Sequence, residues 1–172
     1  MTESLKIAVA DDEPKTLAYF QETLMELGHE VICAAGNGAE LVKQCRDSHP
    51  DLIITDIKMP DMDGIQAASE ITREKPAPVI LVSAYHDSEL IERAQKDHVL
   101  AYLIKPVKQA NLETAIALAT RRFKEFQALH QQAKDLRQAL EDRKIIERAK
   151  GIIMKRSGLD EQDAFRRLQL LS

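Results

Sequence analysis

The stretch DLIITDIKMPDMDG, residues 51–64, decides the fold expected for this chain of 172 residues. It joins an apolar run, residues 52–55, to an acidic loop that contains Pro60 and ends at Gly64. Apolar runs of this length are typical of strands that are buried on both faces of a parallel sheet. Because carboxylates resist burial, we expect Asp56 at a strand end that opens into a polar crevice.

The same pattern recurs over residues 1–119. Apolar runs predict strands over residues 6–10, 30–35, 51–55, 78–83 and 99–104. Helical spacing predicts helices over residues 16–27, 38–47, 64–75 and 87–97, and a fifth helix that opens near Val107. Five strand–helix repeats predict an α/β fold, in which a doubly wound, five-stranded parallel sheet carries helices on both faces.

Polar side chains follow four of these five strands. The first strand ends in Asp11, Asp12 and Glu13, the third in Asp56, the fourth in Ser83, and the fifth in Lys105 and Pro106. Because the carboxyl ends of parallel strands meet at one edge, we expect these groups in one crevice. Three carboxylates there repel one another unless a cation such as Mg²⁺ neutralises them. A carboxylate beside a metal can also attack phosphorus and form an aspartyl phosphate.

Four segments resemble the receiver domain of two-component response regulators. They are VADDEP (9–14), DLIITDIKMPDMDG (51–64), VILVSAY (79–85) and AYLIKPV (101–107), in the order typical of that family. The resemblance implies a flavodoxin-like (βα)5 receiver domain over residues 1–120. It also implies that Asp56 is the phosphoacceptor and that a sensor histidine kinase is the phosphodonor.

The resemblance also implies a set of ligands around Asp56. Mg²⁺ would be bound by Asp12, Asp56 and the backbone carbonyl of Lys58, with Asp11 acting through water. Ser83 and Lys105 would hold the phosphoryl group, and Tyr102 would be a switch residue coupled to Ser83. The peptide bond before Pro106 is expected to be cis.

A phosphatase is the competing enzymatic interpretation, because Asp61 and Asp63 form an Asp-x-Asp pair. Phosphatases with an Asp nucleophile need the first Asp of the pair at a strand end. Here the strand ends at Asp56, and Pro60 stands between it and the pair. We therefore expect a regulator rather than an enzyme, one that assists only its own phosphotransfer and dephosphorylation.

A long helix is predicted beyond the receiver, since no Pro or Gly occurs between Pro106 and Gly151. Its apolar residues are spaced by threes and fours, with one extra three after Phe126: Leu112, Ile116, Ala119, Phe123, Phe126, Leu129, Ala133, Leu136 and Leu140. This is a coiled-coil heptad pattern with a stutter. We expect a coiled-coil linker over residues 121–143 and a homodimer through the helix over residues 112–140. The alternative is that the stripe folds back on its own receiver.

Residues 144–172 contain Glu147, Ala149-Lys150-Gly151, Ile153-Met154, Gly158-Leu159 and Ala164-Phe165. Through these residues the segment resembles the ANTAR domain, an RNA-binding antitermination module that is often attached to receivers. A helix end is predicted at Ser157-Gly158 and a second helix from Asp160. Because the family's domain usually has three helices, the resemblance implies a partial ANTAR domain, incomplete at its C-terminal end.

RNA hairpins are the ligand that this second resemblance implies. The expected phosphate contacts are Lys144, Arg148, Lys150, Lys155, Arg156, Arg166 and Arg167. Acidic residues outnumber basic ones over residues 1–119, and the reverse holds over residues 120–172, which is compatible with a nucleic-acid partner for the second part. Two alternatives are a DNA-binding transcriptional response regulator and a stand-alone phosphoryl-accepting receiver that binds no nucleic acid.

Composition excludes several other classes of protein. The two cysteines are too few for a disulfide framework. No apolar run approaches the ~18 residues of a membrane span, and the N-terminus has no pattern of a secretory signal. We therefore expect a cytoplasmic protein with no membrane partner.

Overall fold

The computed structural model describes residues 4–84, 99–158 and 160–169. The chain divides into two compact units, Met1–Glu125 and Phe126–Ser172. Cys33 and Cys45 are both buried free thiols, which agrees with the prediction that disulfides do not hold this fold together.

A five-stranded parallel sheet forms the centre of the first unit. Its strands are β1 (Lys6–Ala10), β2 (Glu30–Ala35), β3 (Leu52–Asp56), β4 (Val79–Ser83) and β5 (Val99–Ile104). Their order across the sheet is β2-β1-β3-β4-β5, and every neighbouring pair is parallel. The predicted strands and the doubly wound topology are therefore confirmed, and the topological switch point lies between β1 and β3.

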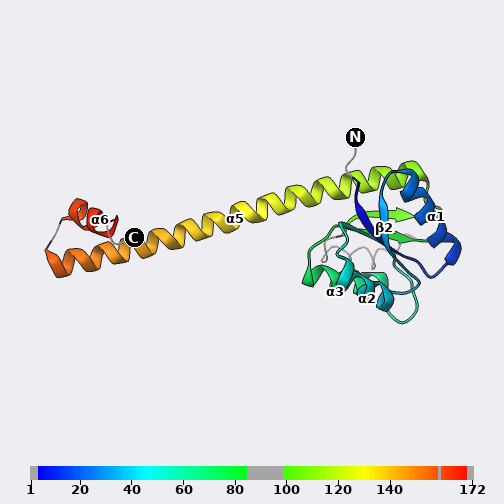
Figure 1. The fold of residues 1–172 in the computed structure, drawn as a ribbon, viewed down its shortest axis with the longest axis horizontal. Coiled ribbons are helices and arrows are strands. Elements are labelled where there is room, and N and C mark those ends of the chain that lie inside the picture. The colour runs from blue at the N-terminus through cyan, green and yellow to red at the C-terminus, as the bar shows by residue number, and fades with distance from the viewer. Residues whose placement is uncertain (1–3, 85–98, 159, 170–172) are drawn as a thin grey trace. The chain divides into compact units, whose positions relative to one another are not determined.

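Helices cover both faces of this sheet. They are α1 (Pro14–Glu26), α2 (Gly38–Ser48), α3 (Gly64–Glu74) and the first part of α5 (Gln109–Ser157). Figure 1 shows α2 and α3 on one face of the sheet, with α1 and the start of α5 on the other. The helix predicted over residues 87–97 lies outside the described residues, so no α4 is assigned.

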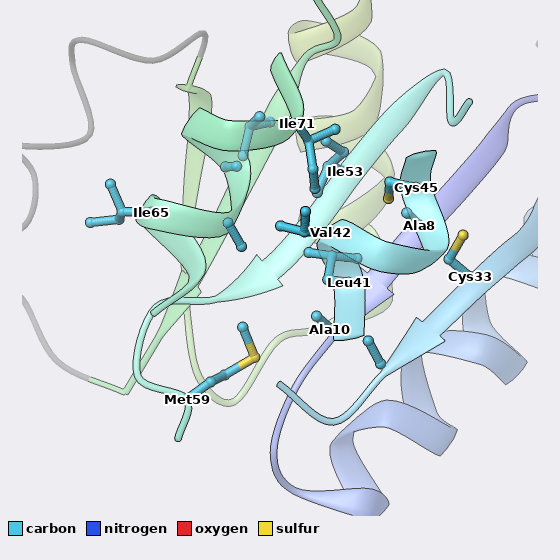
Figure 2. Packing of buried hydrophobic residues seen from close by; sticks show 14 of the residues in the cluster. Ala8, Ala10, Cys33, Leu41, Val42, Cys45, Ile53, Met59, Ile65 and Ile71 are labelled. Carbon is cyan, nitrogen blue, oxygen red and sulfur yellow. The ribbon is translucent and has the colours of Figure 1, made fainter. Parts of the chain in front are cut away.

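Alternating strand residues supply two separate hydrophobic cores, because successive side chains of a strand point to opposite faces. Ile7 and Val9 of β1 pack with the core under α1 and α5. Ala8 and Ala10 pack with the core under α2 and α3, where Figure 2 shows them beside α2. All five strands are thus fixed from both sides, which gives the loops at their carboxyl ends a rigid base.

The apolar stripe of α5 divides into two parts that have different surroundings. Leu112, Ile116, Ala119 and Phe123 are buried, and the first three belong to the core under α1 and α5. From Phe126 onward the stripe is exposed. The expectation that residues 112–140 all face a second chain is therefore wrong for the first four of these side chains. Leu112, Ile116 and Ala119 share a core with Ile80 and Val82 of β4, so they cover the chain's own sheet.

The second unit contains the rest of α5 and the helix α6 (Glu161–Gln169). Gly158 ends α5 with φ +63°, and its N–H donates to the carbonyl of Met154 at 3.0 Å. Asp160 caps α6, since its Oδ1 accepts the N–H of Asp163 at 2.9 Å. The predicted helix end and helix start are both confirmed. None of the described helices is long and apolar enough to cross a membrane.

Candidate functional site

Three carboxylates meet at the carboxyl edge of the sheet, at the switch point between β1 and β3. Asp11 and Asp12 follow β1, Asp56 ends β3, and one oxygen of each lies within 4.8 Å of the other two. Asp11 and Asp56 are buried, with 1% and 6% of their surface exposed, whereas Asp12 is exposed. The site is therefore an acidic pocket that opens to solvent on the side of Asp12.

Lys105 crosses this pocket and bridges the two buried carboxylates. Its Nζ lies 2.5 Å from Asp56 Oδ2 and 2.7 Å from Asp11 Oδ2. Burial raises the pKa of Asp11, and the contact with Lys105 offsets this only in part. Burial lowers the pKa of Lys105, but its contacts with Asp11 and Asp56 outweigh burial, so the pKa is raised and the ammonium group is charged at neutral pH.

Backbone groups hold the other oxygen of each buried carboxylate. Asp11 Oδ1 accepts the N–H of Glu13 at 3.0 Å, and Asp56 Oδ1 accepts the N–H of Lys58 at 3.2 Å. Each carboxylate thus has one oxygen fixed by the loop after its strand and one oxygen turned toward Lys105. This arrangement orients Asp56 before any ligand binds.

Gly64 brings the loop after β3 back against the strand end. Its N–H donates to the carbonyl of Ile57 at 2.9 Å. A Cβ at this position would lie 1.9 Å from the carbonyl oxygen of Asp56, so only glycine fits. The close approach of the two backbone segments is therefore what requires glycine at this position.

The groups predicted from β4 and β5 lie at the same edge of the sheet. Ser83 is 2% exposed, and its carbonyl accepts the N–H of Lys105 at 2.9 Å, which ties the ends of β4 and β5 together. Tyr102 is half-buried and packs against the core under α2 and α3. The peptide bond between Lys105 and Pro106 is cis.

The donor set of the pocket fits a hard divalent cation. Asp11 Oδ2 is buried, and among the described residues its polar contact is the ammonium group of Lys105. Three carboxylates against one ammonium group leave a negative charge in the pocket. Mg²⁺ prefers oxygen ligands of this kind and is usually held by one or two carboxylates.

Two helix caps beside the site were missed by the sequence interpretation. Asp63, considered there only as part of the Asp-x-Asp pair, caps α3 through its Oδ1, which accepts the N–H of Gln66 at 2.7 Å. Asn37 caps α2 in the same way through the N–H of Glu40 at 2.9 Å. The signal was available in both cases, because an Asp or Asn stands three residues before a Gln or Glu where a helical pattern begins.

The basic residues predicted to contact RNA have different surroundings in the second unit. Lys144 pairs with Glu141 at 2.9 Å, and Arg166 lies 3.7 Å from Asp163. Lys150 pairs with the carboxylates of Glu147 and Glu161. The remaining candidates are Arg148, Lys155 and Arg156, which are exposed and pair with no carboxylate among the described residues, and Arg167, whose side chain lies outside them.

Two protein families match this chain, one in each of its two units. Residues 7–117 match the response regulator receiver domain. The chain belongs to the response regulator family. Residues 134–172 of this response regulator match the ANTAR domain.

Two curated relatives are similar to this chain over different lengths. The transcriptional regulatory protein PdtaR of Mycobacterium tuberculosis is 41% identical over 164 residues, which are 95% of this response regulator and 80% of PdtaR. The regulatory protein AtoC of Escherichia coli is 33% identical over 141 residues, 81% of this chain but 30% of AtoC. The similarity to PdtaR therefore extends through both units.

Solved structures match the receiver. The receiver domain of a modulated diguanylate cyclase from Desulfovibrio desulfuricans has a TM-score of 0.67 at 27% identity, over 71% of this chain and 98% of that one. A receiver domain protein from Clostridium thermocellum has a TM-score of 0.64 at 32% identity, over 70% and 98%.

The two domains together identify the class of function. A receiver followed by an ANTAR domain is a phosphorylation-regulated response regulator with an RNA-binding output. This is the architecture of a regulator rather than of a catalytic family. A receiver domain implies a histidine kinase as partner, and it binds Mg²⁺ in an acidic pocket such as that of Asp11, Asp12 and Asp56.

Proposed function

We propose that this response regulator accepts a phosphoryl group on Asp56 from a histidine kinase, and that the modification controls binding of RNA hairpins and thereby transcription antitermination. The observation that carries the proposal is the position of Asp56. Its carboxylate ends a buried strand, one oxygen is fixed by the N–H of Lys58, and the other contacts Lys105. A nucleophile held in one orientation beside a cation is what phosphoryl transfer requires.

The proposed reaction uses the carboxylate of Asp56 as the nucleophile. One of its oxygens attacks the phosphorus of a phosphohistidine and the phosphorus–nitrogen bond breaks. The histidine leaves as a neutral imidazole, because its other ring nitrogen already carries a proton. Lys105 must give up its contact with Asp56 Oδ2 for the new phosphoryl group. It can stay in the pocket meanwhile, because its contact with Asp11 is independent of that oxygen.

A bound Mg²⁺ would offset the negative charge that collects on the phosphoryl oxygens during transfer. The residues that would hold it are Asp12, Asp56 and the backbone carbonyl of Lys58, with Asp11 acting through water. The open side of the pocket at Asp12 supports this assignment, because Mg²⁺ usually keeps several of its waters.

The proposed switch lies at the ends of β4 and β5. The hydroxyl of Ser83 and the ammonium group of Lys105 would hold the phosphoryl oxygens, and the backbone hydrogen bond between these two residues joins the strands that carry them. Contacts made only by the phosphorylated state would shift the receiver toward one of two arrangements. Ser83 pairs with Ile104 across β4 and β5, and Tyr102 lies two residues before Ile104 on β5. In this proposal the side chain of Tyr102 changes its position when Ser83 binds the phosphoryl group.

A dimer through the exposed part of α5 would connect the receiver to the output. Leu129, Leu136 and Leu140 expose 66%, 64% and 51% of their surface and repeat at coiled-coil spacing. A second copy of the same helix carries the same stripe, so two copies can cover each other along the proposed coiled-coil linker, residues 121–143. In this proposal receiver, linker and output occupy residues 1–120, 121–143 and 144–172.

The dimer predicts a strong effect of polar substitutions in the stripe. Leu136→Gln with Leu140→Gln removes four apolar side chains from the dimer, so its dissociation constant should rise roughly 1,000-fold or more. Analytical ultracentrifugation over a concentration series measures this. Leu118→Gln is the matched control, because Leu118 is a 47% exposed leucine of the same helix outside the stripe. A double variant that dimerises like the unsubstituted chain would exclude this interface.

The RNA output is tested against its two alternatives by electrophoretic mobility shifts at two salt concentrations. The phosphorylated chain is offered a hairpin RNA and duplex DNA of the same sequence. Binding to the RNA alone is the expected result. Binding to the duplex alone would support a DNA-binding regulator, and binding to neither would support a receiver with no nucleic-acid output.

A further inference from the structure

Two opposite faces of α5 carry basic residues in the second unit. One face packs toward α6 and is half-buried at Ala149, Lys150, Ile153 and Met154. Ala164 of α6 is completely buried. A cation on this face lies beside another helix, whereas a cation on the opposite face is open to a partner.

Lys150 belongs to the face that packs toward α6. Its Nζ lies 3.0 Å from Glu147 Oε1, on the same helix, and 2.6 Å from Glu161 Oε1, in the first turn of α6. Only 12% of its side chain is exposed. Two carboxylates neutralise this ammonium group, and one of them makes the connection to α6.

The opposite face carries the exposed cations without a carboxylate partner. Arg148, Ile152, Lys155 and Arg156 are separated by four, three and one residues, so they lie on one side of α5. Ile152 exposes 56% of its surface between the charged residues. We name these four residues the outer stripe.

We propose that the outer stripe is the surface of the ANTAR domain that contacts RNA phosphates, and that Lys150 acts as a positioning residue that holds α6 on α5. The inference rests on the proposed RNA output and narrows it to one helix face. Charge complementarity selects the ligand, since phosphate oxygens favour cations that have no competing carboxylate. The ammonium group of Lys150 would have to give up two such partners first.

Salt dependence separates a phosphate contact from a positioning residue. The logarithm of the affinity falls linearly with the logarithm of the salt concentration. Each phosphate contact that is lost should reduce the magnitude of this negative slope by about 1. The phosphorylated full chain is titrated with a labelled pool of RNA hairpins with randomised loops, over a series of salt concentrations. Arg148→Gln, Lys155→Gln and Arg156→Gln should each reduce the magnitude of the slope. Lys150→Gln should weaken binding by roughly two- to five-fold, the effect of an ion pair of this kind, at an unchanged slope.

Two controls match these substitutions. Arg143→Gln removes an exposed cation from α5 seven residues before Lys150, on the same face, and should leave the slope unchanged. Amide hydrogen exchange in α6 reports the positioning role without RNA. Lys150→Gln and Glu161→Gln should both accelerate it, whereas Glu147→Gln, which removes a partner of Lys150 within α5, should not.

The outcomes distinguish a wrong assignment of the helix faces from a failure of RNA binding as a whole. A slope that falls in magnitude for Lys150→Gln, or stays constant for all three outer-stripe variants, overturns the assignment of faces while RNA binding itself stands. If the outer-stripe variants keep the slope but change the oligomeric state, the stripe is a protein interface instead. If the unsubstituted chain binds no RNA, both the proposed RNA output and the proposed role of the outer stripe are contradicted.

Discussion

Replacing Asp56 by asparagine is expected to abolish covalent phosphorylation of the chain. Asparagine keeps the size of the side chain but has no carboxylate nucleophile, so no aspartyl phosphate can form. Incubation with acetyl phosphate and Mg²⁺, followed by mass spectrometry of the intact chain, should detect one added phosphoryl group in the unsubstituted protein. The signal for Asp56→Asn should fall to background.

Asp61→Asn is the matched control for this experiment. Asp61 lies in the same loop, is exposed, and adopts φ +66°, which asparagine also tolerates. The receiver interpretation predicts normal phosphorylation of this variant, whereas a phosphatase with its nucleophile at Asp61 predicts the loss of the signal. Full labelling of Asp56→Asn would show that another residue accepts the group.

Replacing Gly64 by alanine is expected to destabilise the receiver by about 3 kcal/mol or more, the upper range for forcing atoms into a packed site. The new Cβ would lie 1.9 Å from the carbonyl oxygen of Asp56 and 2.7 Å from Thr55 Oγ1. Neither the end of β3 nor the start of α3 can move away without breaking the hydrogen bond between Gly64 and Ile57. Urea denaturation followed by circular dichroism measures the loss.

Gly36→Ala is the control for the alanine substitution. Gly36 precedes α2 on the same domain, and the nearest atom to a Cβ there is Glu40 Oε2 at 3.9 Å. Its free energy of unfolding should stay within about 1 kcal/mol of the unsubstituted value, the range of ordinary effects of glycine on the unfolded chain. Equal stability of the two variants would mean that the loop after β3 is free to move.

The sheet and the acidic pocket were predictable because each depends on a local pattern. Strands buried on both faces require apolar runs, and these runs, such as residues 79–83, appear in the sequence within one residue of their observed bounds. The topology of parallel strands then brings residues such as Asp11, Asp56 and Lys105 to one edge. Neither the strand bounds nor the position of these residues at the sheet edge depends on a particular long-range side-chain contact.

The surroundings of α5 were less predictable, because periodicity identifies an apolar face and not the partner that covers it. Leu112 and Leu136 belong to the same spacing pattern, yet the first is buried under the sheet and the second is exposed. The change from buried to exposed falls between Phe123 and Phe126, one step before the extra three residues, so the spacing does not mark it.

Ion pairs between helices were not predictable from the sequence either. Lys150 was one of seven equivalent basic residues until its contact with Glu161, eleven residues away, distinguished it. Such contacts depend on how the turn at Gly158 directs α6 against α5, and the sequence spacing does not contain that information.

The central claim, that modification of Asp56 controls the RNA output, is tested most directly by one affinity measurement. The dissociation constant for hairpin RNA is determined with and without acetyl phosphate, at constant Mg²⁺ and salt, for the unsubstituted chain and for Asp56→Asn. The phosphodonor should change the constant of the unsubstituted chain by about 5-fold or more, the lower range of allosteric coupling, and leave that of Asp56→Asn unchanged. An equal change in both proteins, or in neither, would contradict the claim.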